Sequence, residues 1–333
     1  MLTLDSLRGG LNDELLAAWE ERDEHHKFQL VCIVHDVTDT TWQPAITEWS
    51  RRQAIRFLPI SEHVANGFRQ LFEVLADSGD EDIRSAGYEY LPIDVHIPVL
   101  DLGDAPDRLF RTLSNVVIQG SFTRSRRDYD NIFEDLLESL ADDPTAWGYL
   151  PLRDAGASYE PDPSLRSPPF RLFLLGSGWL EIPDELKNIV TMHVDLNYTD
   201  FYTLMKGMDV CLPAFADNGY YQYQASSTFV MAVECNVPLL ATDRMKKSYA
   251  YVNDDRVVIT RPAAMGEIAA VKALRQGSAQ DFLEQSNYNA PIRDSVHRMM
   301  RRGWVRNREE VGAFKQSLWE RNEGVVERLL GDL

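Results

Sequence analysis

The sequence predicts an α/β protein with parallel sheets in two domains. The chain has 333 residues, which is more than the roughly 250–300 at which a single hydrophobic core stops growing. Short apolar runs rich in β-branched residues alternate with segments of helical periodicity, most regularly in the second half. Hydrophobic residues make up 44% and charged residues 26%, the balance of a globular protein that can bury a core.

The charge balance narrows the classes of partner. The chain has 52 Asp and Glu against 34 Lys and Arg, a formal net charge of −18. Such a surface repels phosphate backbones and anionic lipid headgroups, so we expect no nucleic-acid partner. A small anionic substrate is compatible with it, because an Arg cluster or a helix N-terminus can hold a diphosphate within an acidic protein.

The cysteines and the N-terminus predict a cytoplasmic protein. Cys32, Cys211 and Cys235 each lie in an apolar run and have no metal-ligand spacing, so we expect buried thiols in a reducing compartment. The N-terminus is acidic and helix-like, without a basic stretch followed by an apolar one. Because no window reaches about 18 consecutive apolar residues, we expect no transmembrane segment.

The first third contains two predicted strands. Residues 28–34 (FQLVCIV) and 54–60 (AIRFLPI) are short apolar runs that end at polar residues, which is typical of strands buried on both faces. Residues 11–24 and 63–75 have apolar residues at helical spacing and predict helices. An extended segment over 88–100, interrupted by two prolines, follows them.

The second part repeats the alternation with a surface insertion. The stretch 150–169 is rich in proline and small residues and predicts no regular structure. Around it we expect strands at 116–119, 171–175, 190–194, 209–213, 237–242 and 257–260, helices at 129–140, 200–207 and 224–235, and a charged helical end over 279–330.

The acidic loop 101–107 (DLGDAPD) marks the predicted domain boundary. We expect an incomplete Rossmann-like domain at 1–105, because only a helix precedes its first strand. A complete Rossmann-like domain is expected at 106–300. Residues 301–333 are expected to form a C-terminal helix that packs back on the first domain.

Several motifs carry a resemblance to a known family. They are FLLGSG (173–178), IPDELKNIVTMHVDLNYTDFYTLMKGMDVCLPAF (182–215) and MAVECNVPLLATD (231–243) in the second domain, with IVHDV, PISEHV and YEYLPIDVHIP in the first. In order and spacing the chain from about residue 28 to 300 resembles retaining GT-B glycosyltransferases of the group 1 (family-1/family-4-like) type. The resemblance implies that the second domain binds a nucleoside diphosphate sugar, with no separate cofactor.

The segment GSFTRSRRDYD predicts a phosphate site. Gly120 lies between a strand and a helix, where backbone N–H groups face a ligand edge, and Arg126 and Arg127 follow it. The alternative is a basic helix start on a solvated face, but arginine at a helix N-terminus is electrostatically misplaced. The resemblance also implies a phosphate-binding Arg or Lys here.

Two further segments are candidates for the same ligand. Gly176 and Gly178 end a predicted strand and allow close approach of a ligand, although a plain turn also explains them. Ser226, Ser227 and Thr228 precede a predicted helix and either donate hydrogen bonds to phosphates or simply cap the helix.

The resemblance implies the remaining site residues. His193 and Asp195 occupy the place where relatives hold the nucleotide base, and His35 the place of a histidine that faces the sugar or acceptor, although a lone histidine at a strand end is more often structural. Many relatives have two glutamates eight residues apart where this chain has Tyr223 and Met231. Glu234, one helical turn later, is the substitute candidate.

No metal site is expected. The pattern Asp128-x-Asp130 begins a predicted helix, where acids favour the helix dipole, and we interpret it as structural. The other histidines lack metal spacing.

These observations together predict a glycosyltransferase that moves a sugar from a nucleoside diphosphate sugar to an unknown hydroxyl acceptor. Two alternatives stay open. In the first alternative, the chain is a non-catalytic protein or one that needs a partner subunit to complete its first domain. In the second, it is an epimerase or phosphorylase of the same architecture. A phosphorylase would need a cofactor lysine site that the sequence does not display.

Overall fold

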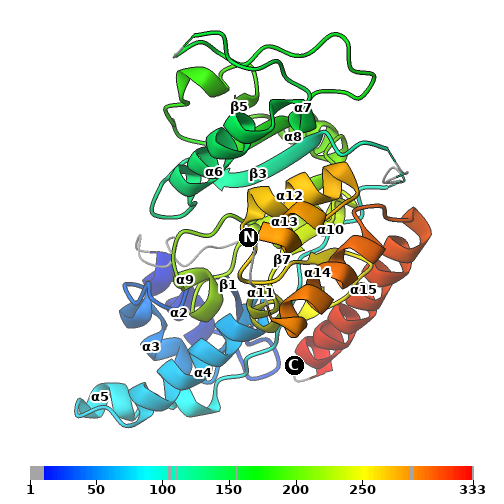
Figure 1. The fold of residues 1–333 in the computed structure, drawn as a ribbon. Coiled ribbons are helices and arrows are strands. Elements are labelled where there is room, and N and C mark those ends of the chain that lie inside the picture. The colour runs from blue at the N-terminus through cyan, green and yellow to red at the C-terminus, as the bar shows by residue number, and fades with distance from the viewer. Residues whose placement is uncertain are drawn as a thin grey trace.

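The computed structural model describes residues 11–103, 107, 109, 111–154, 156–285 and 289–331. They form two parallel sheets, one of two strands and one of six. We refer to residues 11–103 as the N-terminal unit and to the described residues of 111–306 as the C-terminal unit. Figure 1 shows the first in blue and cyan and the second in green to orange. The predicted α/β class with parallel sheets is confirmed.

The N-terminal unit is built on β1 and β2, which pair in parallel from Leu30 opposite Ile55 to Val34 opposite Pro59. Every β2 residue is buried, whereas β1 alternates, with Val31 and Ile33 45% and 50% exposed. One face of β1 is therefore uncovered. The elements of this unit are α2 (Asn12–Glu20), β1 (Leu30–Val34), α3 (Gln43–Arg51), β2 (Ile55–Pro59), α4 (Glu62–Ala76), α5 (Glu81–Arg84) and η2 (Tyr88–Tyr90).

Aromatic side chains fill the space between these strands and their helices. Phe57 of β2 lies 5.4 Å from Phe68 and 5.0 Å from Phe72 between ring centroids, and both partners belong to the apolar face of α4. Trp42 packs on the same Phe57 ring at 5.9 Å. Large rings bury much apolar area per residue, so this small sheet has a dense core.

The C-terminal unit has six parallel strands in the order β5-β4-β3-β6-β7-β8. Their carboxyl ends therefore lie along one edge, which is the usual ligand edge of such sheets. Its elements are β3 (Asn115–Ser121), α6 (Tyr129–Asp142), α7 (Pro144–Trp147), β4 (Arg171–Ser177), η3 (Asp184–Leu186), β5 (Val190–Val194), α8 (Tyr198–Lys206), β6 (Val210–Cys211), α9 (Gly219–Gln222), α10 (Ser227–Glu234), β7 (Leu239–Ala241), α11 (Asp243–Ser248), η4 (Ala250–Val252), β8 (Val258–Thr260), α12 (Glu267–Gln276), α13 (Gln280–Gln285) and α14 (Ala290–Arg302).

Two hydrophobic clusters divide the faces of this sheet. On one face, α6 and α12 pack together over inward residues such as Val116 and Leu174. The other face, with Val117 and the α10 residue Phe229, belongs to the same cluster as the core of the N-terminal unit. The two units thus share one continuous core.

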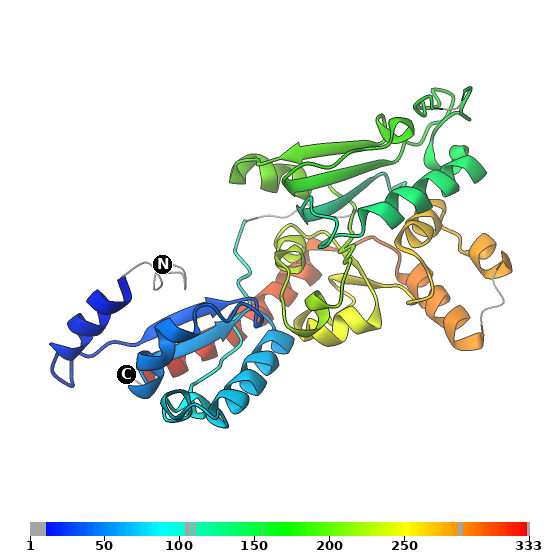
Figure 2. The same ribbon diagram turned by 90° about the vertical axis from the view of Figure 1, so that its left-hand side faces the viewer.

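The last helix, α15 (Arg308–Gly331), crosses back to the N-terminal unit (Figure 2). Trp319 donates from its indole N–H to the carbonyl of Val99 at 2.8 Å. The Asn322 amide both donates to the carbonyl of Ile97 and accepts from its N–H, at 2.7 and 3.1 Å. Buried hydrogen bonds of this kind, from a side-chain amide to the backbone, fix the helix against the extended segment that precedes residue 101.

The sequence predictions differ from the structure in detail. The expected continuous helical end over 279–330 is three helices, α13, α14 and α15. The chain turns between α14 and α15 at Gly303, whose φ is +63°. The short helices α3 and α11 and the longer α12 were not predicted. The described part of 150–169 contains no helix or strand, as expected for the insertion. The proposed domain boundary between 105 and 106 lies outside the described residues.

Candidate functional site

Arg127 is the central residue of the candidate site. It lies between the end of β3 and the start of α6, and only 3% of its surface is exposed. Its Nη2 donates to the hydroxyls of Ser226 at 3.1 Å and Thr228 at 3.0 Å. The same nitrogen reaches the carbonyl of Gln119 at 3.2 Å. The side chain therefore points from the β3 end to the start of α10.

The acceptors around Arg127 are all neutral. They are two backbone carbonyls and two hydroxyls, and no carboxylate among the described residues forms an ion pair with this guanidinium. The rings of Phe215 and Tyr220 lie 5.1 Å from its central carbon, which stabilises the cation in part. A buried charge without a counterion is costly, so the protein keeps a positive charge here that no acid among the described residues pairs with.

The N-terminus of α10 adds a second source of positive potential. Ser226 caps the helix, its hydroxyl accepting from the N–H of Thr228 at 3.3 Å. Ser227, the first residue of the helix, is exposed. Free N–H groups and the helix dipole make such an end attractive to anions. The helix start and Arg127 have the same sign, so together they favour an anionic ligand. We call Gly120, Arg127 and Ser226–Thr228 the Arg127 site.

Gly120 provides space for the guanidinium. Its φ is +139°, and a Cβ at this position would lie 2.7 Å from Nη2 of Arg127. A side chain here would therefore displace the arginine.

Gly176 and Gly178 are glycines for reasons of backbone packing and conformation. A Cβ on Gly176 would lie 1.7 Å from the carbonyl oxygen of Gly120 on the neighbouring strand, so packing alone requires glycine there. Gly178 is exposed and has a φ of +105°, a conformation that favours glycine.

Three further predicted residues lie around this edge of the sheet without joining the Arg127 contacts. Arg126 is exposed, and the described residues give its guanidinium no hydrogen bond or ion pair. His193 of β5 is half-buried and stacks on Phe173 at 6.0 Å between ring centroids. Asp195 is exposed with a φ of +50°, and its N–H donates to the carbonyl of Gly176 at 2.8 Å.

His35 approaches the site from the N-terminal unit. Its side chain is exposed, and its carbonyl accepts from the N–H of Ala225 at 2.7 Å. The N–H of Val37 donates to the carbonyl of Tyr223 at 2.9 Å. These bonds join the end of β1 to the segment 223–225, directly before the α10 cap.

Glu234 is placed away from this group. It is the last residue of α10, which puts it about 12 Å along the helix from Ser226. Its fully buried carboxylate accepts from the N–H of Leu100 at 2.8 Å and from the hydroxyl of Tyr202 at 3.1 Å. Burial raises the pKa of Glu234. The structure gives this glutamate a role in fastening the connecting segment.

The sequence did not indicate the aromatic wall of the site. Besides the rings beside Arg127, Tyr249 accepts the N–H of Ser226 on its hydroxyl at 3.0 Å and stacks on Phe229 at 3.9 Å between centroids. Burial raises the pKa of Tyr249 above its ordinary range. Its neutral hydroxyl therefore holds the first turn of α10. No sequence signal distinguishes this tyrosine from an ordinary core residue.

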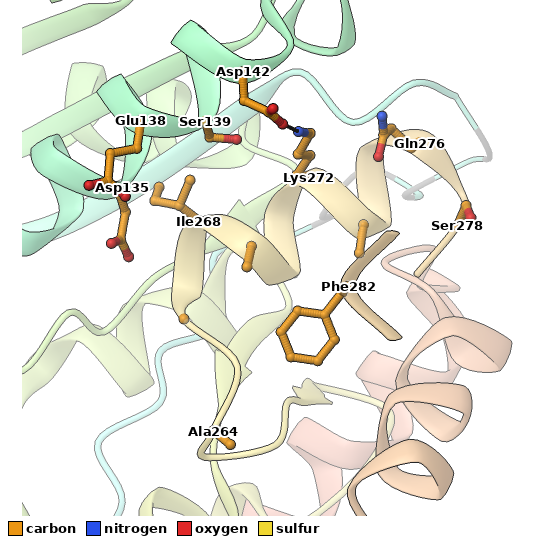
Figure 3. A pocket seen from close by; sticks show the side chains of 13 residues that line it. Asp135, Glu138, Ser139, Asp142, Ala264, Ile268, Lys272, Gln276, Ser278 and Phe282 are labelled. Atoms are coloured by element: carbon orange, nitrogen blue, oxygen red, sulfur yellow. Dashed lines mark hydrogen bonds and ion pairs between the residues drawn. The ribbon is translucent and has the colours of Figure 1, made fainter. Parts of the chain in front are cut away.

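A separate hollow of about 560 Å³ lies between α6 and α12 (Figure 3). Asp135, Glu138 and Asp142 line it, and Lys272 lies 3.4 Å from Asp142. Acidic walls disfavour a phosphate ligand, so this hollow does not compete with the Arg127 site for a nucleotide.

Neither a metal cluster nor a membrane-spanning helix occurs in the part of the chain that the structure describes. Among the described residues, no group of three or more histidines, cysteines or acids is arranged to hold a metal ion. No described helix has the length and apolar character that crossing a membrane requires.

Known proteins resemble the chain in fold. No protein-family model matches it, and no curated protein matches its sequence. Solved structures match it over nearly its whole length. Sucrose-phosphate synthase (tll1590) from Thermosynechococcus elongatus has a TM-score of 0.48 and 12% sequence identity, and the match covers 99% of this chain and 79% of that one. The lipopolysaccharide outer core galactosyltransferase WaaB in its apo form has a TM-score of 0.40 and 11% identity, covering 96% of this chain and 80% of that one, and CalG4, the calicheamicin glycosyltransferase, has a TM-score of 0.39 and 14% identity, covering 96% and 79%. These likenesses concern the fold alone.

Proposed function

We propose that the chain binds a nucleoside diphosphate sugar at the Arg127 site and transfers its sugar to a hydroxyl acceptor. The observation that carries this proposal is the buried guanidinium of Arg127, which meets the N-terminus of α10 without a carboxylate partner among the described residues. A diphosphate supplies the missing negative charge.

The proposed chemistry is electrostatic. The bond between the sugar C1 and the diphosphate oxygen breaks, and its electron pair leaves with the diphosphate. The acceptor oxygen forms the new bond to C1 and loses its proton to the departing phosphate oxygen. Charge grows on the diphosphate in this step, where the α10 N–H groups and Arg127 stabilise it. Of the N-terminal unit, His35 is the residue we propose to face the sugar or acceptor.

A screen with UDP-glucose, GDP-glucose and ADP-glucose tests the proposal. One of them is expected to raise the melting temperature by several degrees when present far above its Kd, since 100 Kd of ligand adds about 2.7 kcal/mol of stability. The same nucleotide sugar is expected to release its nucleoside diphosphate when acceptors are added. If none of the three shifts the melting temperature, the proposal is overturned.

A second candidate is a protein that binds the nucleotide sugar without turnover. It is favoured by the two-stranded sheet of the N-terminal unit, with Val31 and Ile33 exposed, and by the position of Glu234 at the far end of α10. Stabilisation by a nucleotide sugar with no release of its diphosphate, across a panel of sugar and lipid acceptors, supports this candidate instead.

A further inference from the structure

His63 connects the two units through its imidazole ring. It lies in the first turn of α4, in the N-terminal unit. Its Nδ1 is 2.9 Å from the carbonyl oxygen of Ser248, and its Nε2 is 3.0 Å from the carbonyl oxygen of Gln224. Both oxygens belong to the C-terminal unit, so one side chain spans the junction.

The two contacts have a consequence for the protons on the ring. Carbonyl oxygens only accept hydrogen bonds, and a neutral imidazole has a single N–H in either tautomer. Only the imidazolium donates to both oxygens at once. With a neutral ring, one of these short contacts places two lone pairs against each other.

We propose that His63 acts as an imidazolium clamp that positions the start of α10 for the nucleotide. This inference rests on the proposed function for its ligand, but its statement about the ring does not. His63 is a positioning residue, since it acts through Gln224 and has no bond to the Arg127 site itself.

The path from the clamp to the site is short. Gln224 is two residues before Ser226, and its side-chain amide donates to Asp36 at 3.0 Å. On the other side, the His63 ring meets the edge of Tyr249 at 4.7 Å between centroids. Tyr249 in turn accepts the N–H of Ser226 at 3.0 Å. The cap of α10 is thus held through two neighbours of His63.

Other ionisable groups lie on the elements around His63. Burial raises the pKa of three tyrosines: Tyr221 on α9, Tyr249 between α11 and η4, and Tyr251 on η4. Their hydroxyls therefore stay neutral. Three charged groups lie around the junction, and each has a partner. Glu62 pairs with Arg321 of α15, and Asp36 accepts hydrogen bonds from Gln224 and Thr38. The guanidinium of Arg244 lies over the Tyr221 ring, 4.1 Å from its centroid.

The sign of the pH effect follows from the donor count. With both protons on the ring the clamp is complete. Loss of either proton at higher pH removes one bond, and nucleotide affinity is then expected to fall by about tenfold, the equivalent of one hydrogen bond.

The first test uses the unliganded full chain. In a ¹⁵N spectrum of the imidazole nitrogens, recorded at about pH 5.5, the signals that vanish in His63→Gln are expected to be those of a doubly protonated ring. Signals of a neutral single tautomer at that pH overturn the inference whether or not any nucleotide binds.

The second test measures UDP-glucose affinity from about pH 5.5 to 8, with GDP-glucose and ADP-glucose in parallel. Their diphosphates are esterified at both ends and do not titrate in this range. The wild type is expected to lose affinity as pH rises. His63→Phe is expected to bind weakly and His63→Gln with intermediate affinity, both without pH dependence. A wild-type slope that survives in His63→Phe overturns the clamp. A doubly protonated ring with no nucleotide bound by any form instead contradicts the proposed function and leaves the clamp in place.

Discussion

The two units of this molecule reach a packed core by different means. The C-terminal unit has six strands with helices on both faces. The N-terminal unit has two strands, and it is supported by α15 and by the segment 223–225, both of which lie outside its own sequence. The N-terminal unit therefore depends on contacts with the rest of the chain, and those of the segment 223–225 lie directly before the α10 cap of the Arg127 site.

Truncating the N-terminal core tests this dependence with the largest expected effect. Phe57→Ala removes a buried ring packed against Phe68 and Phe72, and we expect a loss of about 3–5 kcal/mol in the free energy of unfolding. Urea unfolding followed by circular dichroism measures it. Because the core is continuous, Phe57→Ala and Leu174→Ala in the other unit should each shift one shared transition. Two separate transitions, only one of them moved by each variant, would show that the units are independent.

Gly120→Ala sharpens the comparison on the side of the C-terminal unit. The new methyl group would lie 2.7 Å from the Arg127 guanidinium, so we expect a loss of about 1–3 kcal/mol in stability together with weaker nucleotide binding. Gly277→Ala is the matched control, since it also has a positive φ but nothing within 4 Å of its Cβ. Thermal unfolding with and without UDP-glucose compares them, and equal binding by both variants would refute the steric explanation.

Glu234→Gln has the smallest expected effect and tests the junction between the units. Burial raises the pKa of Glu234 in the folded chain, so the folded state holds its proton more tightly than the unfolded state. Stability is then lost as pH rises from the ordinary glutamate value through the raised one. Glutamine keeps an acceptor oxygen for the N–H of Leu100, and its NH2 group can donate to the hydroxyl of Tyr202, without the charge. We expect it to flatten this part of the pH profile and to change stability at pH 7 by about 1 kcal/mol or less. Urea midpoints measured across pH check this. A steeper profile, or lost nucleotide binding, would contradict the structural role.

The fold was largely predictable because apolar periodicity reports burial. The strands at 116–119, 171–175 and 190–194 were expected from their short apolar runs, and β3, β4 and β5 contain them. The missed helix α12 contains the buried polar residues Glu267 and Arg275, which obscure an apolar face. The turn at Gly303 was hidden in a charged segment where helix formers continue on both sides.

The site was only partly predictable. Arg126 and Arg127 are adjacent residues that the sequence alone does not distinguish. Only the position of α10 determines that the guanidinium of Arg127 is buried while that of Arg126 faces solvent. Glu234 was selected by its spacing from Met231, and the helix then places it at the end remote from the cap. The bond pattern of His63 depends on two carbonyls 161 and 185 residues away in sequence, which no local motif encodes.

The most direct test of the central role of Arg127 is a calorimetric titration of UDP-glucose, GDP-glucose and ADP-glucose into Arg127→Lys and Arg126→Lys. Both variants keep the formal charge, but only the first removes the forked contacts to Ser226 and Thr228. We predict at least a tenfold loss of affinity in Arg127→Lys, about 1.4 kcal/mol, and little change in Arg126→Lys. Equal affinities in the two variants, or a larger loss in Arg126→Lys, would contradict this role.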